Sequence, residues 1–328
     1  MTTSPRGFDV SRGARWLSWL LGAALLGAVV WAALHFSEER AFVRLAERAE
    51  PWWLVAAVVL QAGTYVAQGW IWRRVSQAAD HRLSRRTAFE LGLAKLFADQ
   101  ALPSAGLSSS ILVAKVLESR LPSPAANASV LVNIASYHLA YVLALSAAMV
   151  IMASRGDVNA LMMVAAVLFL LFSLGLSAAV LGLSGAGHGA LTDRLRSGPA
   201  LRALFDFLAG ADARLVRSPR VLGEAIVLQG AIMLLDAATI WTIIRALGVT
   251  TSGGGVFASF MIASLFRTMG IAPGGLGTFE ATSVWTLGMV GVDLAVALSA
   301  TLLFRGLSFW IPMLPGYWFS RRLMTSGS

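Results

Sequence analysis

The sequence predicts an all-α fold: a polytopic membrane helix bundle with six spanning helices and two broken-helix hairpins that re-enter the membrane in inverted orientation. Composition is the first reason, because 57% of the 328 residues are hydrophobic and 13% are charged, with a mean hydropathy of +0.71. Soluble domains carry about 25% charged residues. The second reason is a series of apolar runs near the ~20 residues that a spanning helix needs. The third is that glycine- and proline-rich breaks interrupt two further apolar stretches.

Six apolar runs predict spanning helices, and together they form one integral membrane domain over 16–322. The first run follows three arginines, but it is too long for the core of a signal peptide, so we interpret it as a spanning helix. A tail over 1–15 precedes the domain and a tail over 323–328 follows it. The predicted spans are 16–36, 52–72, 128–153, 158–183, 221–247 and 294–320.

Two interrupted stretches predict the hairpins. The stretch 87–118 breaks near Pro103, and the stretch 256–291 breaks at Pro273. Helical breaks inside a membrane are tolerated only where protein buries the backbone or where it lines a polar cavity. Each hairpin belongs to one half of the chain, either 16–183 or 221–322, and a loop with an amphipathic helix over 184–220 joins the halves.

The arginines predict the orientation, since cytoplasmic segments carry an excess of basic residues. If both hairpins re-enter, the basic segments all fall on one side of the membrane; they are 1–15, 73–86, 184–220 and 321–322. We therefore expect both termini to be cytoplasmic in a bacterial inner membrane. The hairpins then enter from opposite faces, which is typical of an inverted repeat with a binding site between its breaks.

Three charged residues surround the second break. Arg267 precedes it, Glu280 follows it, and Arg305 lies in the last predicted span. A charge near the middle of a membrane costs about 2.5–3.5 kcal/mol, so such residues are usually functional. One interpretation is a polar cavity that binds an anionic or zwitterionic head group, and the other is an internal salt bridge that pins the hairpin to the last helix. We expect the first, in which Glu280→Gln and Arg305→Gln keep a stable fold and lose activity.

The break itself, Pro273-Gly274-Gly275-Leu276-Gly277, is part of the candidate substrate site. Adjacent glycines indicate a turn that needs positive φ or close backbone packing. We expect Gly274 and Gly275 to resist bulky substitutions.

The first half contributes three further candidate substrate-binding residues. Lys95 and Asp99 are four residues apart and share one helix face, so they either mirror the second site or form an ion pair within the helix. Ser108 either binds phosphate at a helix N-terminus or acts as an ordinary N-cap. Asp236, in the span 221–247, is either a coupling site or the partner of Arg267 or Arg305.

A few other residues are expected to shape the helices and the contacts between them. We expect Asn133 and His138 to form hydrogen bonds between helices, and Pro312 and Pro315 to kink the last helix. The stretch 199–217 is typical of an amphipathic helix on the cytoplasmic leaflet.

The composition also limits cofactors and partners. The net charge of +9 comes mostly from arginines in connecting segments, so we expect no nucleic acid as a partner. The chain has no cysteine and no evident metal-ligand pattern, so we expect no metal and no cofactor. The expected partner is a membrane lipid, with lipid- or glycan-synthesis enzymes as candidate protein partners.

Several of these motifs together resemble one family. The run Pro273 to Glu280, followed by Gly288, Gly291, Ala297, Arg305 and Pro312, looks like the C-terminal signature of the lysylphosphatidylglycerol synthase transmembrane (flippase-like) family. In the first half, Trp70-Ile71-Trp72-Arg73 and Leu102–Gly106 fit the same family, and the resemblance covers nearly the whole chain. It implies that Glu280 and Arg305 are characteristic intramembrane charges and that the glycines form a re-entrant turn.

The resemblance has two departures. The family often has a basic residue shortly after the first break, where this chain has Ser108-Ser109-Ser110. Full synthases also carry an aminoacyl-transferase domain, whereas this chain ends soon after its last span. The resemblance therefore implies a module that translocates a polar lipid, such as a phospholipid or an aminoacylated, isoprenoid or hopanoid lipid. The alternatives are an intramembrane lipid-linked transferase and a non-catalytic scaffold for a lipid- or glycan-synthesis complex.

Overall fold

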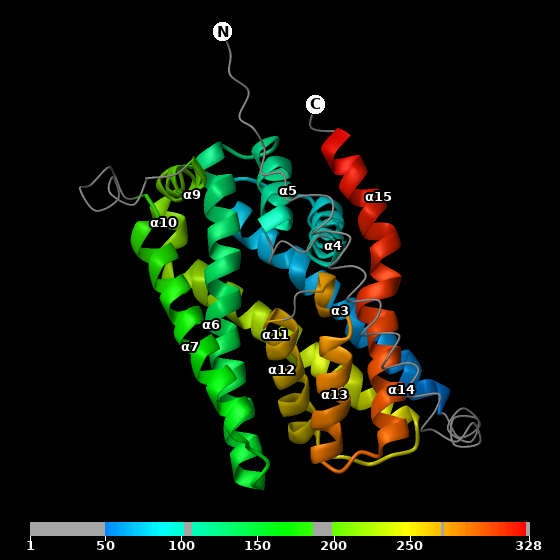
Figure 1. The fold of residues 1–328 in the computed structure, drawn as a ribbon. Coiled ribbons are helices and arrows are strands. Elements are labelled where there is room, and N and C mark those ends of the chain that lie inside the picture. The colour runs from blue at the N-terminus through cyan, green and yellow to red at the C-terminus, as the bar shows by residue number, and fades with distance from the viewer. Residues whose placement is uncertain (1–49, 102–106, 186–198, 270–271, 326–328) are drawn as a thin grey trace.

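The computed structural model describes residues 50–101, 107–185, 199–269 and 272–325, and these residues contain helices and no β-strand (Figure 1). In chain order the elements are α3 (Pro51–Ala78), α4 (Arg85–Ala101), α5 (Leu107–Glu118), α6 (Ser123–Arg155), α7 (Ala160–Leu183), α9 (Pro199–Ala209), α10 (Ala213–Val216), α11 (Pro219–Ala246), α12 (Gly253–Met269), the 3₁₀ turn η1 (Pro273–Gly275), α13 (Thr278–Met289), α14 (Leu294–Arg305), the π-helical turn η2 (Gly306–Trp310) and α15 (Ile311–Thr325).

Within the described residues, five helical segments are long and apolar enough to cross a membrane. They are α3, α6, α7, α11 and the continuous segment α14–η2–α15, and they coincide with five of the predicted spans. The predicted span 16–36 and the tail 1–15 lie outside the described residues. The outer face of α7 shows why the bundle needs lipid around it, because Leu161, Val164, Leu168 and Leu171 are all more than half exposed. The fold is therefore that of an all-helical integral membrane protein.

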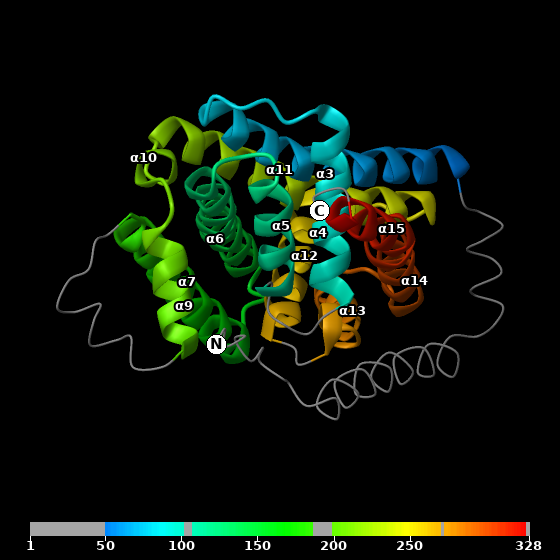
Figure 2. The same ribbon diagram turned by 90° about the horizontal axis from the view of Figure 1, so that it is seen from above.

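The two interrupted stretches form two helix pairs at opposite ends of the molecule. The pair α4 and α5 lies in the upper part of Figure 1, and α12 and α13 lie in the lower part, with η1 between them near the centre. The element η1 also contacts α4, so the second break lies against the first helix pair. Figure 2 shows α3 and α11, the helices that precede the pairs, side by side along one edge of the bundle.

The helix lengths repeat between the halves of the chain. The helices α3, α4, α5 and α6 contain 28, 17, 12 and 33 residues. The helices α11, α12 and α13 contain 28, 17 and 12 residues, and the segment α14–η2–α15 contains 32. Each of the first two elements begins 168 residues after its counterpart (219 against 51, 253 against 85), and each of the last two begins 171 residues after it (278 against 107, 294 against 123). This correspondence pairs residues of the two halves by position.

Local sequence sets the boundaries of these helices. Proline stands in the first turn of both α3 and α11, where its missing N–H leaves no intrahelical bond unmade. The helix α6 ends at Gly156 in the left-handed conformation, with a φ of 77°. The next helix begins after Asn159, whose side chain accepts a hydrogen bond from the N–H of Met162 at 2.9 Å.

Two hydrophobic cores are stacked within the bundle, one at each end. The lower core in Figure 1 joins α12, α13 and α14 to parts of α6 and α7, and the upper core joins α4, α5 and α10 to other parts of the long helices. Buried polar side chains lie between the two cores. On α3, Gln61 lies between Ala57 of the lower core and Ile71 of the upper core, and on α11 Gln229 lies between their members.

The segment predicted as an amphipathic surface helix forms α9 and α10. Three of its apolar side chains, Phe205, Leu208 and Leu215, are buried against the protein, and α9 packs on α6 and α7. Leu201 and Leu204 remain about half exposed. The apolar face is therefore shared between the bundle and the surroundings, because α6 and α7 offer an apolar surface that the sequence pattern alone does not show.

Candidate functional site

The second break adopts the backbone that its glycines were predicted to need. Gly274, Gly275 and Gly277 have φ values of 59°, 65° and 79°, a region that side chains disfavour. A Cβ atom at Gly274 would lie 2.2 Å from the ring of Phe309, and one at Gly275 would lie 2.2 Å from Cγ of Arg267. Both positive φ and close packing therefore require glycine here.

Glu280 closes the turn from within the first turn of α13. Its Oε2 accepts a hydrogen bond of 2.6 Å from the N–H of Gly277, the residue that caps the helix. A carboxylate at this position satisfies a backbone donor that has no helical partner and interacts favourably with the helix dipole. Glu280 is fully buried, so it holds the turn from inside the protein.

Arg305 joins this turn to the last membrane segment. Its Nε donates to Oε1 of Glu280 at 2.6 Å, and its Nη2 donates to the carbonyl of Gly274 at 3.1 Å. The guanidinium also lies over the ring of Phe309 at 4.3 Å and near that of Phe279 at 5.3 Å. Arg305 is only 4% exposed. The arginine, the carboxylate and the turn form a buried lock between α13 and α14.

The lock changes the expected outcome of mutation. We expected Glu280→Gln and Arg305→Gln to keep a stable fold, on the interpretation that both side chains line a hydrated cavity. Their burial and mutual contacts favour the alternative, since removal of one partner leaves an uncompensated buried charge. We now expect the single variants to be destabilised. A direct contact of either residue with substrate stays a prediction.

Arg267 differs from Arg305 because no described carboxylate pairs with it. It stands in the last turn of α12, is half-buried, and makes no hydrogen bond or ion pair to the described residues. Its stem packs against Gly275. Among the described charged residues beside the break, Arg267 therefore differs from Glu280 and Arg305 in forming no ion pair.

Asp236 belongs to a set of polar contacts between α3, α6 and α11. Its Oδ1 accepts a hydrogen bond of 3.1 Å from Nε2 of Gln61. It forms no ion pair with Arg267 or Arg305, although one of them was the predicted alternative partner. Asn133 confirms its predicted role between helices, because its Oδ1 accepts hydrogen bonds from Gln68 at 3.3 Å and Gln229 at 3.1 Å.

His138 also makes the predicted contact between helices. Its Nδ1 lies 3.2 Å from the hydroxyl of Ser173, which joins α6 to α7. This contact lies away from the break and serves packing.

The candidates of the first half are placed only in part. Nζ of Lys95 lies 2.6 Å from Oδ2 of Asp99, so the predicted ion pair within the helix is present. Both side chains retain some exposure, at 18% and 29%. Ser108 lies in the first turn of α5, and its side chain is outside the described residues, as is that of Pro273 in η1. By the repeat, Asp99 occupies the position of Arg267, so each half has one charge just before its break.

The π turn η2 was not predicted from the sequence. The N–H of Ile311 donates to the carbonyl of Gly306, five residues back, and Pro312 has no N–H to donate. Ile311 and Pro312 therefore do not donate to the carbonyls of Leu307 and Ser308, as residues at these positions would in an α-helix. Tyr65 of α3 donates to the first of them and Gln100 of α4 to the second, at 3.0 Å. Pro312 was the available signal, since a proline frees carbonyls one turn before it.

Comparison with known proteins places this arrangement in a family. Residues 19–316 match the model of a family described as the lysylphosphatidylglycerol synthase TM region. The chain belongs to this family. All the candidate site residues, from Lys95 to Arg305, lie within the matched region.

A curated relative matches a shorter stretch of the chain. A UPF0104 membrane protein of Methanothermobacter thermautotrophicus is 30% identical over 99 residues, which is 30% of this chain and 30% of that protein. The chain therefore matches less than a third of the length of this curated relative. The lysylphosphatidylglycerol synthase TM region is the membrane part of that synthase, so membership establishes a multi-pass membrane protein.

Proposed function

We propose that this chain binds a polar membrane lipid and moves it between the two leaflets. The lipid classes that fit are phospholipids, aminoacylated phospholipids and isoprenoid or hopanoid lipids. The observation that carries the proposal is Arg267, a half-buried arginine beside a helix break with no described partner. An arginine can donate two parallel hydrogen bonds to one phosphate group. A charge inside the membrane without a structural partner is typical of a substrate path.

We further propose that both helix pairs re-enter the membrane. The second helix of each pair, α5 or α13, has 12 residues, which corresponds to about 18 Å. A membrane core is about 30 Å thick, so neither helix is long enough to cross it. The equal lengths in the two halves and the opposite ends of the molecule support an inverted repeat with the site between the breaks (Figure 1).

The proposed orientation follows from the arginines. Arg73 and Arg74 near the end of α3, Arg217 beside α10 and Arg321 in α15 belong to elements that end at the upper face of Figure 1. Basic residues concentrate on the cytoplasmic side. We propose that this face is cytoplasmic in a bacterial inner membrane, and that both termini are on it.

Lipid movement accounts for the site better than lipid-linked group transfer does. A transferase needs an acid or base that can reach substrate, and Glu280 already contacts Arg305 and Gly277. A scaffold for synthesis enzymes would not need the charge of Arg267 inside the bundle. Enzymes of lipid or glycan synthesis remain proposed partners that would supply or use the lipid.

Purified protein in liposomes tests the proposal. A fluorescent phosphatidylglycerol labelled on its acyl chain is placed in both leaflets, and dithionite reduces the label of the outer leaflet. We expect the wild-type protein to expose the inner label and Arg267→Gln to slow this step about tenfold or more, because a hydrogen bond to a charged group contributes about 1.5–3 kcal/mol.

The matched control is Arg155→Gln. Arg155 ends α6 on the opposite side from the cytoplasmic face and pairs with Asp157 at 3.1 Å, so this variant makes the same charge change at a surface site and should move lipid like the wild type. Vesicles with wild-type protein that behave like protein-free vesicles would contradict lipid movement and favour a scaffold.

A further inference from the structure

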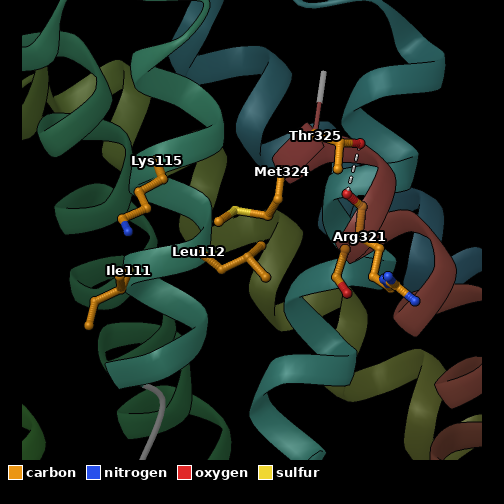
Figure 3. Close-up of a pocket in the computed structure, with 7 residues that line it drawn as sticks. Ile111, Leu112, Lys115, Arg321, Met324 and Thr325 are labelled. Atoms are coloured by element: carbon orange, nitrogen blue, oxygen red, sulfur yellow. Dashed lines mark hydrogen bonds between the residues drawn. The ribbon is translucent and has the colours of Figure 1, made fainter. Parts of the chain in front are cut away.

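A groove lies between α5 and α15 at the upper face of the molecule. Its volume is about 380 Å³, which is in the range of about 300–1,000 Å³ typical of ligand pockets. Figure 3 shows its lining residues, which come from α5 and α15. The groove is separate from the break, from Arg267 and from the Glu280–Arg305 lock. Its lining includes Ile111, Leu112, Lys115, Arg321, Met324 and Thr325.

The apolar part of the groove is exposed. Ile111 is 58% exposed and Met324 is 45% exposed. In Figure 3, the side chains of Leu112 and Met324 lie between the two helices, and Ile111 lies one turn further from the end of α5 than Lys115. An exposed apolar groove at the end of a membrane bundle fits a lipid acyl chain, because contact with hydrocarbon removes these side chains from water.

The charged part consists of two cations, Lys115 and Arg321, which have no acidic partner among the described residues. Lys115 makes no hydrogen bond or ion pair to the described residues. Arg321 contacts the hydroxyl of Tyr317 at 3.3 Å and that residue's ring at 5.8 Å. No carboxylate is among the residues that line the groove. Arg322, next in sequence, is already paired with Glu90 at 3.4 Å. Within the described part of the chain, the groove therefore combines positive charge that no carboxylate pairs with and an apolar surface.

We propose that this groove binds an anionic phospholipid of the leaflet next to the upper face. In this proposal an acyl chain lies on Leu112 and Met324, and the phosphate binds the charged head of Lys115 or of Arg321, one on each helix that lines the groove. In Figure 3 both charged heads point outward from the groove, so each has to turn toward a bound phosphate. Each long side chain reaches the head group while its stem stays on the apolar surface. An anionic leaflet attracts such cations. The occupant is a bound lipid at the surface of the bundle, so the proposal does not depend on movement of lipid through it.

Native mass spectrometry of the full chain released from nanodiscs tests this proposal. The probe is palmitoyl-oleoyl-phosphatidylglycerol, compared with phosphatidylcholine of the same chains. We expect the wild type to retain phosphatidylglycerol, and the double variant Lys115→Gln/Arg321→Gln to lose at least about tenfold in retention. Met324→Ser should reduce retention by a smaller factor, because it removes only part of the apolar contact. The matched control is Arg214→Gln/Arg155→Gln, which removes two exposed cations elsewhere and should retain lipid like the wild type.

Three results would overturn the proposal. Equal retention of phosphatidylcholine and phosphatidylglycerol would show that the charge of the head group does not contribute to binding. Displacement of the phospholipid by millimolar glycerol 3-phosphate would identify a site for free phosphate. Unchanged retention in the Lys115→Gln/Arg321→Gln variant would place the bound lipid elsewhere. None of these results bears on the liposome assay of Arg267, so the two proposals fail independently.

Discussion

The two halves of the chain have helices of matching length, but the described charges beside their breaks are arranged differently. The second half has a buried carboxylate and a buried arginine at Glu280 and Arg305. The positions 171 residues earlier are Ser109 and Ile134, which cannot form an ion pair. The charged pair of the first half, Lys95 and Asp99, lies within one helix and is partly exposed. The Glu280–Arg305 pair therefore has no counterpart at the matching positions of the first half.

The largest expected effect tests the lock itself. Glu280→Gln or Arg305→Gln removes one member of a pair buried almost completely, and we expect each to lower the free energy of unfolding by about 3–5 kcal/mol. The double variant should recover part of this loss, since it leaves no isolated charge. Thermal unfolding in detergent and the monodisperse fraction after purification measure it. Ser109→Ala, at the matching position of the first half, should cost about 0.5–1.5 kcal/mol; equal costs in the two halves would contradict the comparison.

The next effect concerns the turn that the lock holds. Gly274→Ala introduces a Cβ atom 2.2 Å from Phe309 at a φ of 59°. The left-handed backbone costs a side chain about 1–2 kcal/mol, and overpacking adds about 1–3 kcal/mol. We expect a lower melting temperature and slower lipid movement. Gly288→Ala in α13 is the control, because nothing lies within 4 Å of its Cβ position and alanine favours a helix. A melting temperature for Gly274→Ala as high as that of the control would mean that the turn is not tightly packed.

A smaller effect tests the contacts where the halves meet. Asn133→Leu removes the acceptor that Gln68 of α3 and Gln229 of α11 share. A buried donor without a partner costs about 1–3 kcal/mol, so we expect a loss in this range, measured by thermal unfolding. His138→Phe removes a single contact on the α7 side and should cost less. If the order of the two losses is reversed, the contacts of Asn133 with α3 and α11 do not hold the halves together.

The smallest effect belongs to the first half. Lys95→Gln removes an ion pair between residues four apart on one helix, which contributes about 0.3–0.5 kcal/mol at an exposed site. We expect the melting temperature to change little and the difference to shrink as salt is raised. A loss as large as that of Arg305→Gln would show that this pair is a buried lock like that of the second half.

Much of the fold follows from the sequence because its signals are local. Apolar length identified the five spanning segments of the described region, and the breaks near Pro103 and at Pro273 separated both helix pairs. The need for glycine at Gly274 and Gly275 was also predictable, since adjacent glycines between apolar helices indicate positive φ. Family membership was predictable for the same reason, because the motif around Glu280 is continuous in sequence.

Only the tertiary structure decided which of the charged residues form an ion pair. The sequence placed Arg267, Glu280 and Arg305 near one break and left open whether they line a cavity or form a salt bridge. The packing of α14 against α13 pairs Arg305 with Glu280 and leaves Arg267 without a partner in the described region. The same holds for the freed carbonyls of η2, which Tyr65 and Gln100 satisfy from other helices. Hydropathy and helix breaks are properties of neighbouring residues, whereas a buried charge or carbonyl is satisfied by whichever distant side chain the fold brings within hydrogen-bonding distance.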